Sequence, residues 1–169
     1  SNCIKYHPIS SVPTVLTIHN AQYQGQFGWN KLYYLPAFDL WKAGLLEWDK
    51  DINPLAAAIK CAWRVTTVSP SYLEEMMHNA RGLEGLLRQE RGKCVGILNG
   101  IDAEVWNPET DPMLGTKYNL KTLEAGKAAN KTALCTTFGL DDSKPLFTFI
   151  GRLVDEKGAD ILPDIFYTA

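Results

Sequence analysis

The sequence predicts an α/β fold built on parallel β-strands. Short apolar runs rich in β-branched residues recur along the chain without the polar alternation of half-buried strands. Helix-start signals follow these runs. Polar residues stand directly after the strands, at the end where open parallel sheets bind their ligands. Together these three observations predict strand–helix units with functional residues at one edge of the sheet.

Composition narrows the class of protein. The 169 residues are 46% hydrophobic, which suits one globular domain or parts of two. The net charge of −2, without long runs of one sign, argues against nucleic-acid and anionic-membrane partners. No segment approaches the roughly 20 apolar residues of a membrane span. The widely spaced Cys3, Cys61, Cys94 and Cys135 match no zinc or redox motif, so we expect core residues of a cytoplasmic protein.

The first predicted strand, residues 12–18, ends in His19–Asn20. A histidine at the carboxyl end of a buried strand is a candidate functional side chain, with a structural role as the alternative. The segment 21–51 that follows is long, aromatic and rich in amides. Such irregular segments tend to be functional, and rings with amides suit carbohydrate, although a loop packed by its own rings explains them equally well.

Two helix starts follow in the first half of the chain. Asn53–Pro54 and Ser69–Pro70 each combine an N-cap residue with a proline at the first helical position, on either side of a predicted strand at 65–68. A glycine-bracketed turn at 82–87 opens a further helix. Its backbone N–H groups could bind an anion, or Glu84 could occupy the positive end of the helix itself.

The stretch 94–108 is the predicted joint between two domains. An apolar strand at 94–98 stops abruptly in Asn99–Gly100, a turn dipeptide, and Asp102 follows. We assign residues 1–98 to one domain and residues 99–169 to the joint and the start of a second domain, with a cleft over the joint.

A second strand–helix series follows the joint. Residues 122–138 predict an amphipathic helix that ends at Gly139. Its inward-facing residues should be Leu123, Ala133, Leu134 and Phe138. Residues 145–150 predict a buried strand, and a helix should run through Ile161, Leu162 and Ile165. Within that helix, Pro163 fits only near the first turn or at a kink.

The loop after residue 150 carries two cations. Arg152 and Lys157 lie between the predicted strand and helix, where unpaired backbone N–H groups would add to an acceptor site for a diphosphate. Gly151 would let the backbone approach closely. The sequence contains neither a Walker-type motif nor G-x-G-x-x-G, so an ordinary nucleotide-triphosphatase or dinucleotide site is not indicated.

Five segments resemble, in the same order, the motifs of bacterial glycogen synthases and plant starch synthases, and the resemblance covers nearly the whole chain. They are Thr17–Gly25, Thr67–Tyr72, Gly82–Leu86, Leu98–Pro108 and Gly151–Gly158. Trp63 departs from the family, which usually carries an acidic residue there. The resemblance implies a GT-B glycosyltransferase with two Rossmann-like domains. Its donor would be ADP-glucose, and its acceptor the non-reducing end of an α-1,4-glucan in glycogen biosynthesis. It implies no metal or cofactor.

The resemblance also implies residue roles. His19 would contact the donor glucose near the reacting centre, and Asn99 would lie beside the same sugar. Arg152 and Lys157 would hold the diphosphate as it leaves. The remaining substrate-binding residues implied by the motifs are Asn20, Tyr23, Gln24, Asp102 and Gly151.

The same comparison predicts a fragment. The family's Lys-Thr-Gly-Gly-Leu loop and Glu-Pro-Cys-Gly-Leu segment are both missing, so we expect an internal piece, truncated at both ends and inactive alone. An uncovered sheet face would make such a piece self-associate. Two alternatives stay open. One is a non-catalytic two-lobed module that binds sugar or glucan, and the other is a GT-B transferase that uses UDP-glucose or acts on sucrose.

Overall fold

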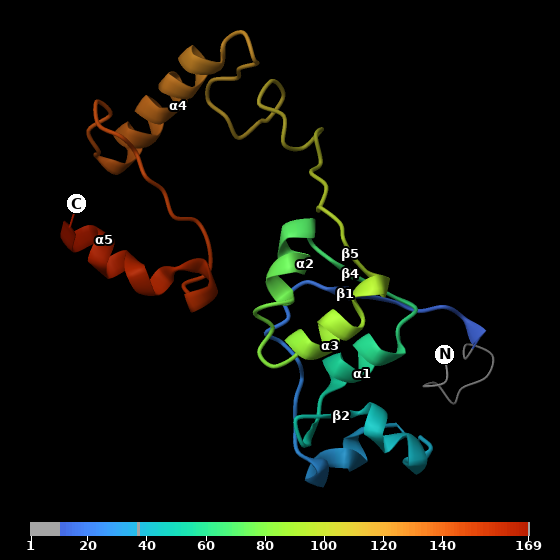
Figure 1. Cartoon of the computed structure of the whole chain (residues 1–169). Coiled ribbons are helices and arrows are strands. Elements are labelled where there is room, and N and C mark those ends of the chain that lie inside the picture. The colour runs from blue at the N-terminus through green and yellow to red at the C-terminus, as the bar shows by residue number, and fades with distance from the viewer. Residues whose placement is uncertain (1–10, 37, 169) are drawn as a thin grey trace. The chain divides into compact units, whose positions relative to one another are not determined.

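The computed structural model describes residues 11–36 and 38–168. It divides the chain into two compact units, Ser1–Gly100 and Ile101–Ala169 (Figure 1). The division falls close to the joint that the Asn99–Gly100 turn predicts. That these units coincide with two domains of a larger protein stays a prediction.

The sheet of the first unit is parallel. It comprises β1 (Val15–Ile18), β4 (Arg64–Thr67) and β5 (Cys94–Gly96), in the order β1-β4-β5. Ile18 pairs with Thr67, and Thr67 pairs with Gly96, so the three strands end side by side. The predicted parallel α/β architecture is confirmed in this unit.

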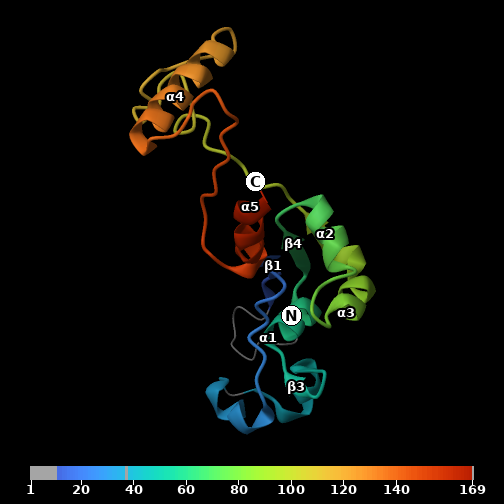
Figure 2. The same cartoon turned by 90° about the vertical axis from the view of Figure 1, so that its left-hand side faces the viewer.

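Three helices cover one face of this sheet. They are α1 (Pro54–Cys61), α2 (Pro70–Met76) and α3 (Glu84–Gln89), and their apolar residues form one core with Ile18, Val65 and Cys94 (Figures 1 and 2). The opposite face leaves Val15, Thr17 and Val95 exposed. The prediction that the strands are buried on both faces is therefore wrong for the described chain, because all three helices pack on the same side.

Both predicted helix caps of this unit are confirmed. The Asn53 Oδ1 atom accepts the backbone N–H of Ala56 at 2.9 Å, and Ser69 Oγ accepts that of Tyr72 at 2.9 Å. Each cap precedes a proline at the first helical position, where the missing N–H costs no hydrogen bond.

The aromatic segment between β1 and α1 is built from short local elements. These are the 3₁₀ helices η2 (Trp29–Tyr34) and η3 (Leu40–Leu45) and the antiparallel pair β2 (Glu47–Trp48) and β3 (Asp51–Ile52). Trp48 is held by a hydrogen bond from its Nε1 to the carbonyl of Gly82 at 2.8 Å. A further 3₁₀ turn, η4 (Arg91–Lys93), leads into β5.

The second unit contains one long helix, α4 (Leu123–Phe138), which ends at Gly139 in the left-handed conformation, as predicted. The predicted inward stripe is wrong, because Leu123, Ala133, Leu134 and Phe138 are all exposed. The covered side faces the preceding connector instead. There Gly126 packs on Tyr118, and Asn130 Nδ2 donates to the carbonyl of Thr116 at 2.7 Å.

Residues 145–150 do not form the predicted buried strand. Phe147 and Ile150 are 92% and 95% exposed. A strand needs a partner for its backbone N–H and C=O groups, and the described part of this unit contains no other strand. The chain continues through η5 (Asp155–Lys157) and η6 (Ala159–Ile161) into α5 (Leu162–Thr168). Pro163 lies in the first turn of α5, where the sequence allowed it.

The described cysteines include two buried free thiols. Cys94 lies in the core of the first unit, where burial raises the pKa of its thiol, and Cys135 is buried on α4. Cys61 is half-buried at the end of α1 and is disulfide-bonded, so the expectation that the cysteines are reduced core residues is wrong for Cys61. Cys3 lies outside the described residues. None of the described helices has the length and apolarity that a membrane span requires.

Candidate functional site

Three candidate segments leave the sheet at one edge of the first unit. Beyond the paired ends of the strands, Thr67 Oγ1 donates to the carbonyl of Ile18 at 2.8 Å. The N–H of Ile97 donates to the carbonyl of Thr67 at 2.8 Å. His19–Asn20, Ser69 and Asn99 follow these strand ends, so the structure places them at the edge that the sequence predicted.

The loop after β1 has a fixed start and exposed side chains. Asn20 Oδ1 accepts the N–H of Gln22 at 2.9 Å, and the N–H of Ala21 donates to the hydroxyl of Tyr72 on α2 at 3.0 Å. His19 and Tyr23 are exposed on either side of the buried Ala21. The backbone is therefore held while both predicted substrate-contacting rings remain accessible to a ligand.

Gln24 differs from its neighbours because its side chain is buried. Its Nε2 donates to the carbonyls of Ala21 at 3.1 Å, Ala80 at 2.9 Å and Arg81 at 3.2 Å, and its Oε1 accepts from Asn53 Nδ2 at 2.7 Å. An amide nitrogen has only two hydrogens, so neither is left for a sugar hydroxyl. These internal bonds favour a structural role for Gln24 over the predicted substrate contact, and the sequence position alone did not reveal them.

The carboxylate of Glu84 bonds to the backbone of the turn before α3. The carboxylate Oε1 accepts the N–H of Ala80 at 2.7 Å and the N–H of Gly82 at 3.2 Å. These backbone hydrogen bonds lower the pKa of Glu84. These contacts give Glu84 a structural role in the turn that leads into α3.

In the second unit, Asp102 stabilises the turn that follows Asn99–Gly100. Its Oδ1 accepts the N–H groups of Glu104 at 3.0 Å and Val105 at 3.1 Å. One carboxylate oxygen is therefore used locally, as expected for an Asp that starts a turn.

The cationic loop of the second unit carries a carboxylate that the sequence analysis missed. Arg152 NH2 contacts Glu156 Oε1 at 3.2 Å, and the arginine side chain is largely exposed. Lys157 is exposed at the end of η5, and its N–H donates to the carbonyl of Val154 at 2.9 Å. The i,i+4 spacing of Arg152 and Glu156 is the signal that could have predicted this pair.

Gly151 lies at the start of the same loop and is exposed. A Cβ atom placed there would meet only the Phe149 ring, at 3.8 Å. Packing within the protein therefore leaves space in front of this backbone. A ligand that approaches it closely would supply the reason for a glycine.

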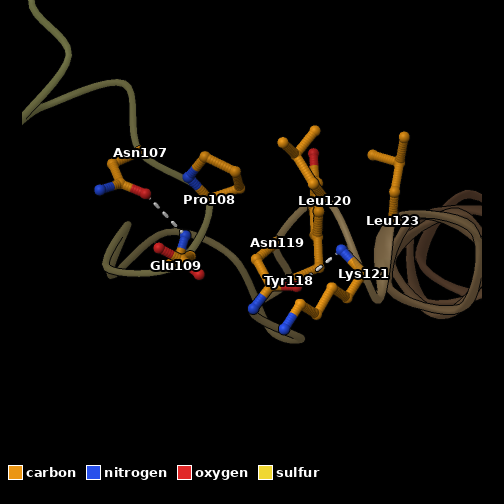
Figure 3. Close-up of a pocket in the computed structure, with 8 residues that line it drawn as sticks. All are labelled: Asn107, Pro108, Glu109, Tyr118, Asn119, Leu120, Lys121 and Leu123. Carbon is orange, nitrogen blue, oxygen red and sulfur yellow. Dashed lines mark hydrogen bonds between the residues drawn. The ribbon is translucent and has the colours of Figure 1, made fainter.

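The second unit also contains a pocket outside the predicted site. Its volume is about 620 Å³, and Figure 3 shows the eight residues that line it, which come from the connector and the start of α4. Asn107 and Asn119 use their side-chain oxygens to accept the N–H groups of Glu109 and Lys121 (Figure 3). None of the residues predicted to bind substrate lines this pocket.

The candidate residues thus divide between the units. His19, Asn20, Tyr23 and Asn99 belong to the first, and Asp102, Gly151, Arg152 and Lys157 belong to the second. That the two groups form one site stays a prediction.

Comparison with known proteins decides the family. A family model described as "Starch synthase catalytic domain" matches residues 3–89. The chain belongs to this family. It is 57% identical over 159 residues to a glycogen synthase of Flavobacterium johnsoniae, covering 94% of this chain and 34% of the relative. It is 40% identical over 167 residues to a glycogen synthase of Rhizobium tropici, covering 96% and 34%.

A solved structure supports the same assignment. The catalytic domain of starch synthase IV from Arabidopsis thaliana, bound to ADP and acarbose, matches with a TM-score of 0.75 and 35% identity. The match covers 92% of this chain and 34% of that one. The predicted GT-B fold class and the resemblance to glycogen and starch synthases are confirmed. The chain spans about a third of the length of the relatives it matches.

Proposed function

We propose that these residues form part of a retaining glucosyltransferase that moves glucose from ADP-glucose to the non-reducing end of an α-1,4-glucan. The observation that carries this proposal is the 57% identity to a glycogen synthase over 94% of the chain. The match to a starch synthase bound to ADP and acarbose supports the choice of a nucleoside diphosphate and a glucan.

In this proposal, the edge of the sheet receives the donor glucose. His19 and Asn99 follow parallel strands that end together, so both can reach a ligand placed over that edge. Asn20 and Tyr23 bind substrate beside them.

Arg152 and Lys157 hold the diphosphate and stabilise its charge as it leaves. Donors aimed at developing charge contribute roughly 3 kcal/mol each in favourable sites. The Arg152–Glu156 pair does not prevent this role, because an exposed ion pair contributes only about 0–1 kcal/mol. A diphosphate carries more charge than one carboxylate and would compete well for the guanidinium group.

The proposal includes no metal ion or cofactor, since two side-chain cations would neutralise the leaving group. It places the enzyme in the cytoplasm on the strength of the resemblance to bacterial glycogen synthases alone. Neither nucleic acid nor membrane is a partner.

The test uses the whole protein that contains residues 1–169. This protein should transfer labelled glucose from ADP-glucose to glycogen, and its rate with ADP-glucose should exceed its rate with UDP-glucose. Arg152→Ala and Lys157→Ala should each lower kcat by about 100-fold. The matched control is Lys127→Ala, on the exposed side of α4. Full rates in both site variants would contradict the diphosphate assignment. Glucan binding without transfer by the wild type would favour the non-catalytic module.

The isolated chain should behave differently from the whole protein. We expect no transfer by residues 1–169 alone, and turnover by them would contradict this expectation. Because the sheet exposes Val15 and Val95, the isolated chain should also self-associate. Light scattering that gives a monomer at all concentrations would refute self-association.

A further inference from the structure

The buried amide of Gln24 joins three segments that are distant in the sequence. It is 8% exposed and lies between its own loop, the N-cap of α1 and the turn before α3. Nε2 reaches the carbonyls of Ala21, Ala80 and Arg81, while Oε1 accepts from Asn53. The backbone carbonyl of Gln24 also accepts the N–H of Leu55 at 3.2 Å. One side chain therefore fixes where the loop after β1 lies against the helices.

The turn at residues 80–82, whose carbonyls accept hydrogen bonds from this amide, makes several further hydrogen bonds. Glu84 accepts the N–H groups of Ala80 and Gly82, and Trp48 donates to the carbonyl of Gly82. Arg81 has φ of 47°, which a non-glycine residue keeps only when its surroundings determine it. Several contacts therefore fix this turn independently of Gln24.

The same amide controls the path of the predicted substrate-binding loop. Its bond to the carbonyl of Ala21 closes a short ring of chain that contains Tyr23. Asn20 lies directly before this ring, and the N–H of Ala21 is anchored on Tyr72. Asn20 thus has anchors of its own, whereas displacement of Gln24 would move Tyr23.

We propose that Gln24 is a positioning residue, which holds Tyr23 in place for the substrate without touching it. This inference rests on the proposed function, because it is there that Tyr23 binds substrate. Gln24 acts only through its neighbours. Its effect on transfer should therefore depend on whether the side chain that it positions is present.

A double-mutant cycle in the whole protein tests this dependence. Gln24→Met keeps the length of the side chain and removes all its hydrogen bonds. It should lower kcat/KM by about tenfold or more, since displacements near 1 Å can cost up to 100-fold. In a Tyr23→Ala background, the same substitution should change kcat/KM by less than about twofold, because the positioned ring is already absent. Gln22→Met is the matched control, since Gln22 is exposed and should leave kcat/KM unchanged.

Measurements well below the melting temperature separate positioning from stability. Equal losses of kcat/KM in both backgrounds, or a lower Tm with unchanged kcat/KM, would overturn the positioning role. If Gln24→Met does not fold, Asn53→Ser replaces it. A serine keeps the cap on Ala56 but loses the bond to Gln24 Oε1. It should lower kcat/KM about threefold in wild type and leave it unchanged in Tyr23→Ala. A wild-type protein without any transfer activity contradicts the proposed function instead.

Discussion

Residues 11–100 and residues 101–168 differ in how they cover their apolar side chains. In the first unit, a parallel sheet and three helices enclose a continuous core. In the second, α4 packs on its own connector, and Phe138, Phe147 and Ile150 remain exposed. Both regions contain apolar runs of similar composition, so hydrophobicity alone does not decide which of them becomes a core.

The difference lies in which backbone groups find partners. β1, β4 and β5 pair with one another, whereas residues 145–150 meet no described strand. α4 forms regardless, because a helix satisfies its backbone internally and Gly139 ends it locally. Helices of this chain therefore depend on local sequence, and its strands depend on segments far away.

The largest expected contrast comes from truncating one apolar side chain in each unit. Leu87→Ala removes a fully buried residue and should lower the free energy of unfolding by about 2–5 kcal/mol. Phe147→Ala removes an exposed ring and should change it by less than about 0.5 kcal/mol. Urea denaturation of the 169-residue chain measures both. Similar decreases in the free energy of unfolding for the two variants would show that Phe147 is packed as tightly as Leu87.

A second contrast uses two glycines in close packing. A Cβ at Gly96 would collide with the backbone of Ser69 and Pro70, and Gly96→Ala should destabilise by about 1–3 kcal/mol. A Cβ at Gly126 would collide with Tyr118, but alanine improves the helix by about 1 kcal/mol and offsets part of the cost. Thermal unfolding should therefore give a lower Tm for Gly96→Ala. The reverse order would contradict the rigid contact between β5 and α2.

The smallest contrast is a dependence of stability on pH. Backbone hydrogen bonds lower the pKa of Glu84, so its stabilising effect is complete above the ordinary carboxylate pKa of 4.5. It is lost as the pH falls through the folded-state value. Glu84→Gln should lower the free energy of unfolding at pH 7. It should also reduce the further loss of stability that the wild type shows as the pH falls below about 4.5. Ser143 lowers the pKa of Asp141 in a local turn, so Asp141→Asn should leave the unfolding of the first unit unchanged. An unaltered loss of stability at low pH in Glu84→Gln would contradict the contacts at Ala80 and Gly82.

The sequence predicted well those features that depend only on neighbouring residues. Three helix boundaries are each signalled within a few positions, and the structure has all three: Asn53–Pro54, Ser69–Pro70 and Gly139. The strand ends at His19 and Ser69 were predictable for the same reason.

The features that sequence missed depend on distant partners. Nothing next to Gln24 shows that Ala80, Arg81 and Asn53 will surround its amide, so its burial could not be predicted. The stripe of α4 was misplaced because Tyr118 and Thr116 in the connector, and not a sheet, determine its covered side.

The central claim is that a ligand at the ends of the parallel strands is also held by the cations of the loop at 151–158. A crystal structure of the whole protein with ADP tests it most directly. We expect the side chains of Arg152 and Lys157 within hydrogen-bonding distance of the diphosphate, with His19 and Asn99 facing the space next to the terminal phosphate. ADP bound elsewhere, or both cations turned away from it, would contradict the account.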